Sequence, residues 1–204
     1  MLPKQKLLNI ASRFRGLLPV VVDVETTGLN PITDALLEIA AIRIAMDKQG
    51  KLYPDEIDFH HVEPFQGAHI DPESLKVTGI DPYCPLRYAV PEQHALHQLF
   101  SKITRWLEEA RCHRAVLVGH NAWFDLAFIQ AAATRCFMRE MNPFHSFTTF
   151  DTATLSGIAL GETVLARAAR AARISFDVNQ AHSAIYDTKR TAELFCYIAN
   201  RTPS

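Results

Sequence analysis

The sequence lacks the apolar segments that are typical of membrane proteins and of secreted proteins. Its longest apolar runs are far shorter than the stretch of about 20 residues that a membrane-spanning helix needs. Residues 1–6 contain neither the apolar segment nor the small-residue cleavage site of a secretory signal. We therefore expect a protein that works in the cytoplasm and does not bind a membrane.

Cysteine and net charge are also scarce. The four cysteines, at positions 84, 112, 136 and 196, are far apart and form neither a Cys-x-x-Cys pair nor a zinc-ligand spacing. Scattered cysteines of this kind are typical of reduced, mostly buried thiols in a cytosolic protein. The formal net charge of −1 gives the whole chain no attraction to nucleic acid. Any polyanion-binding surface must therefore come from local clusters of basic residues.

What the sequence does contain is enough apolar material for one substantial core. Its 204 residues are 48% hydrophobic and 21% charged, which is ordinary for a globular protein. No internal repeat, low-complexity segment or linker divides the chain. We therefore predict a single domain over residues 1–204.

Hydrophobic periodicity predicts an α/β fold. Apolar runs at about 19–25, 36–46 and 51–62 are joined by short turns, which predicts a three-strand antiparallel meander. Two shorter strands, 115–119 and 147–151, alternate with helices and are expected to be parallel. Helices are expected at 4–15, 72–77, 91–110, 123–138, 155–160, 163–173 and 183–200. The prediction is a mixed five-stranded sheet flanked by helices.

Basic residues gather in two of the predicted helices. One group lies beside apolar residues in the first helix and consists of Lys4, Lys6, Arg13 and Arg15. The other group recurs every three residues in the helix at 163–173 and consists of Arg167, Arg170 and Arg173. For any single arginine of this kind, a solvated helix face is the simplest interpretation.

The stretch 20–28, Val-Val-Val-Asp-Val-Glu-Thr-Thr-Gly, places two carboxylates in a predicted buried strand. Side chains alternate between the two faces of a strand, so Asp23 and Glu25 project from the same face. Two like charges side by side in a core are costly unless a cation lies between them. A strand end that simply reaches water is the competing explanation, so this pair alone leaves metal binding open.

Two further stretches place carboxylates at the starts of helices. The run 120–125, His-Asn-Ala-Trp-Phe-Asp, stands where a buried strand passes into a helix, and sites gather at such junctions in open α/β sheets. In the second stretch, Asp187 lies near the start of the last predicted helix and His182 precedes that helix. Each residue alone has an ordinary explanation, because helix dipoles favour aspartate in a first turn and a histidine there can be a surface residue or a cap.

Taken together, the three stretches resemble the motifs of the DEDDh exonuclease superfamily. They are Asp-Val-Glu-Thr-Thr-Gly from residue 23, His-Asn-Ala-Trp-Phe-Asp from residue 120 and His-Ser-Ala-Ile-Tyr-Asp from residue 182. A closer resemblance, to the bacterial ribonuclease T family, is carried by residues 14–16, 34–41, 61–65, 142–145, 180–184 and 200–201. The resemblance covers nearly the whole chain and implies a ribonuclease-H-like fold.

This resemblance implies an activity and a metal site. Members of the family are homodimeric 3′-to-5′ exoribonucleases that trim tRNA and other stable RNAs and also degrade single-stranded DNA. Such enzymes hydrolyse phosphodiester bonds with two Mg²⁺ ions, for which Mn²⁺ is an alternative, and release nucleoside 5′-monophosphates. The resemblance assigns His182 to this metal site as the general base on the attacking water. It assigns the metal ligands to Asp23, Glu25, Asp125 and Asp187.

The resemblance also implies which residues bind the substrate. Aromatic side chains stack on the last bases of a single strand with little demand on sequence. The matching positions here are Glu73, Phe124 and Phe147. Leu29 and Val77 stand where the family usually has phenylalanine, which predicts weaker stacking and a weaker dislike of a 3′-terminal cytosine. Basic residues that would bind the RNA body, and in the family serve the active site of the other subunit, are Arg13, Arg15, Arg111, Arg114 and Arg139.

Other functions stay open on the sequence. A DNA proofreading or repair exonuclease would carry the same three motifs. A nucleic-acid-binding scaffold that has lost catalysis is disfavoured, because the four carboxylates and the histidine are all intact. A small-molecule phosphodiesterase or a degrader of short oligonucleotides would differ in its preference for substrate length.

Overall fold

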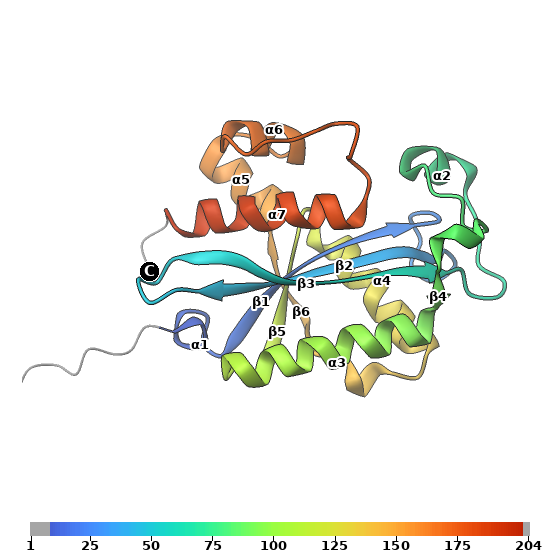
Figure 1. The fold of residues 1–204 in the computed structure, drawn as a ribbon, viewed down its shortest axis with the longest axis horizontal. Helices are drawn as coiled ribbons and strands as arrows, with labels where there is room; N and C mark the ends of the chain where they lie inside the picture. Colours follow the sequence, from blue (N-terminus) through green and yellow to red (C-terminus); the bar gives the residue numbers. More distant parts are fainter. Residues whose placement is uncertain (1–8, 202–204) are drawn as a thin grey trace, which may run out of the picture.

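The computed structural model describes residues 9–201 and consists of a mixed sheet with helices on both faces (Figure 1). Its strands are β1 (Leu17–Thr26), β2 (Leu36–Met46), β3 (Leu52–Glu63), β4 (Val90–Pro91), β5 (Arg114–Gly119) and β6 (Phe144–Asp151). Its helices are α1 (Ile10–Arg13), α2 (Pro72–Thr78), η1 (Pro85–Arg87), α3 (Glu92–Ala110), α4 (Ala122–Arg135), η2 (Arg139–Met141), α5 (Thr152–Leu160), α6 (Leu165–Ala171) and α7 (Ala184–Ala199). The predicted fold class is confirmed.

The sheet has the strand order β4-β3-β2-β1-β5-β6. Strands β1, β2 and β3 form the predicted antiparallel meander, and β5 and β6 extend it by parallel pairing. Strand β1 lies near the middle and is covered on both faces, which explains its continuous apolar run at 20–22. The pairing of β1 with β5 ends at Val21, so the rest of β1 projects beyond β5 towards the C-terminal edge of the parallel strands.

The sheet has six strands where five were predicted. The additional strand is β4, which pairs in parallel with Val62 and Glu63 at the end of β3. Two residues are too few to show an alternating pattern, and Pro91 argues against a strand. Proline is nevertheless tolerated at the edge of a sheet, where its missing N–H removes no ladder hydrogen bond.

Helices α3 and α7 cover opposite faces of the sheet (Figure 1). Helix α3 buries the predicted apolar stripe, which includes Leu99, Ile103 and Trp106, and α7 buries Ala192 and Phe195 in the same main core cluster. A smaller apolar cluster joins α6 to α7. Across the described residues, no helix combines the length and apolar character that crossing a bilayer requires.

The basic helix predicted at 4–15 is shorter in the structure. Lys4 and Lys6 lie outside the described residues, and within the described part α1 covers only Ile10–Arg13. The chain leaves the helix at Arg15, whose φ of 54° is left-handed. Helix α5 begins three residues earlier than predicted, because the Asp151 side chain accepts the N–H of Ala153 and caps its first turn.

Candidate active site

The carboxylates predicted from the three motifs come from three elements that meet beyond the end of the β1–β5 pairing. We call the set the acidic cluster, and its members are Asp23 and Glu25 on β1, Asp125 in the first turn of α4 and Asp187 in the first turn of α7. A ring nitrogen of His182 and carboxylate oxygens of Glu25 and Asp187 lie within 4.8 Å of one another. The start of α7 lies over the second half of β1 (Figure 1).

Asp125 joins the cluster through a hydrogen bond to the backbone of β1. Its Oδ1 accepts the N–H of Val24 at 3.1 Å, and its side chain is almost fully buried. Val24 lies past the last residue of β1 that pairs with β5, so its N–H has no partner in that ladder. Because Val24 stands between Asp23 and Glu25, this bond holds the start of α4 against the two carboxylates of β1.

Burial and mutual repulsion raise the pKa values of the acidic cluster. Burial raises the pKa of Asp23 well above its usual value, and the charges of Asp125, Glu25 and Asp187 raise it further. Burial, followed by the charges of Asp187 and Glu38, raises the pKa of Glu25 to about 8. Burial also raises the pKa of Asp125 to about 8, against two backbone hydrogen bonds that lower it. Among residues 9–201, no lysine or arginine forms an ion pair with any member of the cluster.

One oxygen of the cluster is buried without a partner. Asp187 Oδ2 accepts the N–H of His182 at 3.0 Å, whereas Asp187 Oδ1 has no hydrogen bond in the structure. A buried carboxylate oxygen without a partner is costly, and a bound cation would remove that cost. Carboxylate oxygens are hard ligands that suit Mg²⁺ or Mn²⁺. The residues of the acidic cluster therefore fit divalent metal ions.

His182 lies on the segment that leads into α7. Its side chain is exposed, and its φ of 66° places its backbone in the left-handed region. Left-handed conformations cost on the order of 1–3 kcal/mol for residues other than glycine, and they cluster at functional sites. The hydrogen bond from its own N–H to Asp187 holds the backbone of His182 in place, while its ring is open to solvent.

Sequence reasoning missed a fifth carboxylate, Glu38 on β2. Glu38 is 7% exposed and is the register partner of Glu25. Its Oε2 accepts the N–H of Ala184 at the start of α7 (3.2 Å), and its Oε1 lies 3.1 Å from Nδ1 of His61. A carboxylate inside the apolar run 36–46, in which Arg43 is the other charged residue, was the signal that could have revealed it.

Sequence reasoning also missed Asp34, which connects the loop after Glu25 to the segment before α2. Its side chain is buried and accepts hydrogen bonds from the N–H of Asn30 (2.9 Å) and the hydroxyl of Thr33 (2.8 Å), with Nδ1 of His69 at 3.0 Å. These hydrogen bonds lower the pKa of Asp34 despite its burial. An aspartate in a polar turn is common, so no feature of the sequence indicates this role.

The residues predicted to bind the terminal bases are mostly exposed. Leu29, on the loop after β1, is 79% exposed, and Phe147 on β6 is 80% exposed. Val77 and Glu73 lie on the exposed side of α2, where Glu73 pairs with a neighbouring lysine of the same helix. Phe124 is half-buried and packs against Phe128 in α4, with ring centroids 4.8 Å apart. Their contacts with a substrate stay a prediction.

The predicted basic residues differ in their surroundings. The guanidinium of Arg13 donates to main-chain carbonyls in the β2–β3 turn and at the end of α7 (2.8 and 2.6 Å), so it is bound within the fold. Arg15 is exposed. Arg114 and Arg139 line one surface hollow of about 820 Å³ along α4, together with Arg135. The structure therefore brings two of the predicted RNA-binding residues together, and their role stays a prediction.

The strand order and the helices on both faces of the sheet define a ribonuclease-H-like fold. Two solved exonuclease I structures share this fold. The Escherichia coli enzyme in complex with a dT13 oligonucleotide superimposes with a TM-score of 0.69 and 20% identity over 91% of this chain. The enzyme from Methylocaldum szegediense superimposes with a TM-score of 0.71 and 18% identity over 92% of this chain. The chain spans 41% of the length of each, and at this identity the likeness shows the fold alone.

Sequence comparison places the chain more narrowly. The exonuclease family model RNase_T matches residues 20–195. Ribonuclease T of Enterobacter sp. (strain 638) is 56% identical over 196 residues, which cover 96% of this chain and 87% of that protein. Ribonuclease T of Yersinia enterocolitica is 55% identical over 201 residues, which cover 98% and 93%. The chain belongs to the ribonuclease T family, which confirms the predicted 3′-to-5′ exoribonuclease and disfavours the DNA repair alternative.

Proposed function

We propose that this exonuclease trims the 3′ ends of tRNA and other stable RNAs, and that it also degrades single-stranded DNA, releasing nucleoside 5′-monophosphates. The observation that carries the proposal is the acidic cluster, in which Asp187 has a buried oxygen without a partner beside His182. The name of the relatives, ribonuclease T, supports RNA as the substrate. The exonuclease I structure in complex with a dT13 oligonucleotide has the same fold, which is compatible with a single-stranded DNA substrate.

The acidic cluster would hold two divalent metal ions, with Mg²⁺ as the cofactor and Mn²⁺ as an alternative. When bound, such ions neutralise phosphate charge and supply an activated water for hydrolysis. The protein's own contribution is the fixed arrangement of ligands, in which Asp125 is held by the backbone of Val24 and Asp187 by the backbone of His182. Two of these ligands, Glu25 and Asp125, are almost fully buried.

His182 would accept the proton of the attacking water at a ring nitrogen. Histidine is suited to this role because its ordinary pKa lies near neutrality. The ring is exposed, so the proton can pass from it to solvent after each cleavage. Replacement His182→Ala is expected to lower kcat roughly 10²- to 10⁴-fold while Mg²⁺ binding, measured by calorimetry, is retained. A wild-type kcat in this variant would show that His182 is not the proton acceptor.

The last bases of the RNA would lie between the loop after β1, helix α2 and the aromatic residues of α4 and β6. In this proposal Leu29 and Val77 contact one side of the terminal bases, Phe124 and Phe147 stack on them, and Glu73 accepts a hydrogen bond from one base. Aliphatic side chains give less stacking than phenylalanine, so the discrimination against a 3′-terminal cytosine would be weak.

A homodimer and a cytoplasmic location complete the proposal. The RNA body would be bound by exposed Arg15 and by Arg114 and Arg139, which line one hollow. These residues would serve the active site of the partner subunit. Arg13 would hold α1 in place through its hydrogen bond to the end of α7. The four free cysteines fit a reducing compartment. We treat residues 1–204 as one domain, because the main core cluster contains residues from β1 to α7.

The test is 3′-end mapping on a labelled tRNA precursor with an extended 3′ end. Stepwise shortening from the 3′ end is expected with Mg²⁺, and none is expected with EDTA or with the variant Asp125→Asn. A single-stranded DNA of equal length is run in parallel. Intact RNA beside degraded DNA would contradict the proposal and favour a DNA exonuclease.

A further inference from the structure

Helix α6 and the residues directly after it carry a group of basic residues that the proposed function does not use. We call this group the α6 arginine stripe, and its members are Arg167, Arg170 and Arg173. All three are exposed. Arg167 and Arg170 are three residues apart and therefore neighbours on the helix surface. Arg173 follows the end of the helix, where its φ of 61° is left-handed.

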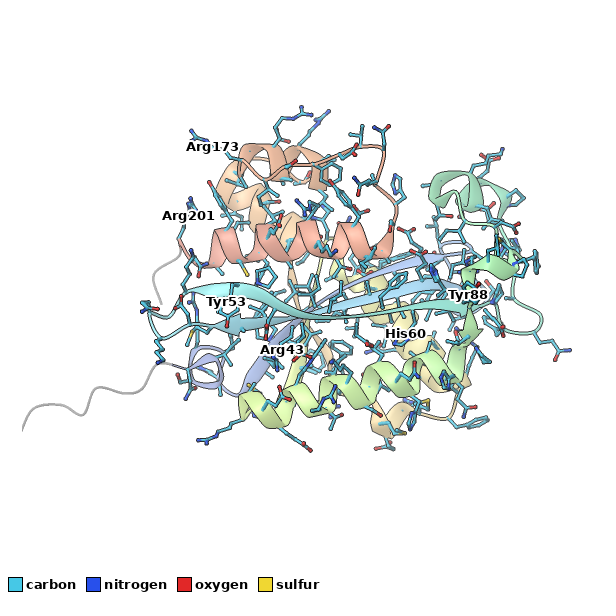
Figure 2. All side chains as sticks on the ribbon, in the orientation of Figure 1. Arg43, Tyr53, His60, Tyr88, Arg173 and Arg201 are labelled. Carbon is cyan, nitrogen blue, oxygen red and sulfur yellow. The ribbon has the colours of Figure 1, made fainter. Side chains whose placement is uncertain are left out.

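The other side of α6 is fixed against the protein. Ala168 and Ala172 are buried against Leu194 and Ile198 of α7 in the smaller apolar cluster. Alanine side chains let the two helices pack closely, so the longer arginine side chains must occupy the outer side of α6. Figure 2 shows the side chain of Arg173 at this outer side, pointing away from the sheet.

The positive charge of the stripe is not neutralised by neighbouring acidic residues. Within residues 9–201, none of its three guanidinium groups forms an ion pair. The neighbouring acid on α7, Glu193, instead pairs with Arg190 of the same helix at 3.1 Å. Three unpaired positive charges in a chain of net charge −1 form a local surface suited to a polyanion.

The residue that precedes α6 by two positions is linked to the acidic cluster through His120. The carbonyl of Thr163, just before α6, accepts a hydrogen bond from Nε2 of His120 at 2.8 Å. His120 is close enough to Asp187 for each to affect the pKa of the other. The residues after Arg173 then lead back to His182 and the start of α7. One end of α6 is therefore connected to the active site, and the stripe leads away from it.

We propose that the α6 arginine stripe binds the phosphate backbone of the single-stranded RNA segment upstream of the 3′ end that is being cleaved. The inference rests on the proposed function, because it needs the 3′ end in the acidic cluster. Guanidinium groups recognise phosphate with paired hydrogen bonds and are always charged. Such contacts are independent of base sequence, so they would increase the affinity for a long strand without affecting the terminal base preference.

The test compares two variants that each lose three exposed positive charges. The stripe variant is Arg167→Gln, Arg170→Gln and Arg173→Gln. The matched control is Lys48→Gln, Lys51→Gln and Arg105→Gln, which removes the same charge from other exposed positions. The substrates are a long single-stranded oligoadenylate and a trinucleotide, and KM and kcat are measured over a range of NaCl concentrations. Melting temperatures check that both variants fold.

For the long substrate, we expect the stripe variant to raise KM roughly tenfold with kcat unchanged. Each lost phosphate contact should lower the slope of log affinity against log salt by about 0.7, so the slope should fall by about 2. The control variant should leave KM within about twofold of wild type. Kinetics on the trinucleotide should be the same in all three proteins, since it is too short to reach the stripe.

Two outcomes would overturn the inference. One is a stripe variant that matches the control on the long substrate. The other is found by also measuring binding to phosphatidylserine vesicles. If the stripe variant keeps wild-type RNA kinetics but loses vesicle binding, the stripe binds anionic lipid and not RNA. If wild-type protein cleaves neither substrate, the proposed function fails by itself. The stripe can then still be tested by titrating labelled oligoadenylate in EDTA.

Discussion

Glu25 on β1 and Glu38 on β2 are direct partners in the antiparallel register, and both carboxyl groups are buried. Like charges directly opposite each other in a sheet are destabilising. The two residues have different surroundings, because Glu38 accepts the N–H of Ala184 whereas Glu25 lies beside His182 and Asp187 in the acidic cluster. Burial and neighbouring charges raise the pKa of Glu25 to about 8. The carboxylates of Glu25 and Glu38 therefore repel each other in the folded protein, and a bound cation would reduce this repulsion.

The first prediction concerns the stability of the metal-free protein. The pKa of Glu25 is about 8 in the folded protein against 4.5 for the unperturbed side chain, so between these values the folded state keeps a proton that the unfolded state has lost. Its contribution to stability is therefore complete below about pH 4.5 and is lost as the pH rises through about 8. Burial raises the pKa values of Asp23 and Asp125 in the same direction. In EDTA, the free energy of unfolding should fall by a few kcal/mol between about pH 5 and pH 9.

Calorimetry over this pH range measures the effect, and Glu25→Gln serves as the control. This variant should have a flatter pH dependence and should exceed the stability of wild type at the alkaline end. Added Mg²⁺ should raise the melting temperature of the wild type more at alkaline pH than at acidic pH, since metal binds the deprotonated carboxylates. A metal-free protein that becomes more stable towards alkaline pH would contradict this account.

The second prediction concerns Glu38 as a support for the start of α7. Replacement Glu38→Ala leaves the N–H of Ala184 without its acceptor, which should cost about 1–3 kcal/mol in unfolding free energy. It should also lower kcat, because α7 begins two residues after His182. Replacement Glu38→Gln keeps an acceptor oxygen and a similar volume, so most of the activity should remain. Equal kcat values for the alanine and glutamine variants would show that this hydrogen bond does not position the histidine.

The outcome for Glu38 and Asp34 shows where sequence reasoning reached its limit. Residues of the acidic cluster were predicted because the three short motifs that contain them together resemble those of a known exonuclease superfamily. Glu38 depends on a contact with Ala184, 146 residues away in the chain, which no local pattern indicates. Asp34 likewise depends on His69, in a different loop. For Arg13 the sequence was misleading in the other direction. A basic residue in an amphipathic segment predicts a guanidinium that is free to bind a ligand. In the structure, the guanidinium of Arg13 instead donates hydrogen bonds to main-chain carbonyls.

The third prediction concerns the turn that follows Glu25. A Cβ added at Gly28 would overlap the carboxylate of Asp34, whose Oδ2 accepts the N–H of Asn30 and whose Oδ1 accepts the hydroxyl of Thr33. Gly28→Ala should therefore displace the Asp34 carboxylate and cost about 1–3 kcal/mol in unfolding free energy. Gly67→Ala is a control for alanine at another glycine, since a Cβ there meets no atom within 4 Å, although its φ of 82° adds some strain. A variant at Gly28 with wild-type stability would mean that the carboxylate can move without cost.

The last prediction concerns Leu29 and Val77, the two aliphatic residues at positions where the resemblance implies phenylalanine. Leu29 and Val77 are 79% and 60% exposed, so a larger ring at either position has room without repacking the core. Stacking of a base on an aromatic side chain contributes about 1–3 kcal/mol, so Leu29→Phe and Val77→Phe together should lower KM for single-stranded RNA at least tenfold. The double variant should also increase the ratio of cleavage rates between substrates that end in adenosine and in cytidine. Leu29→Met with Val77→Ile, which adds no ring, is the matched control and should leave that ratio unchanged. If the phenylalanine variant and this control behave alike, the loop after β1 and helix α2 do not contact the terminal bases.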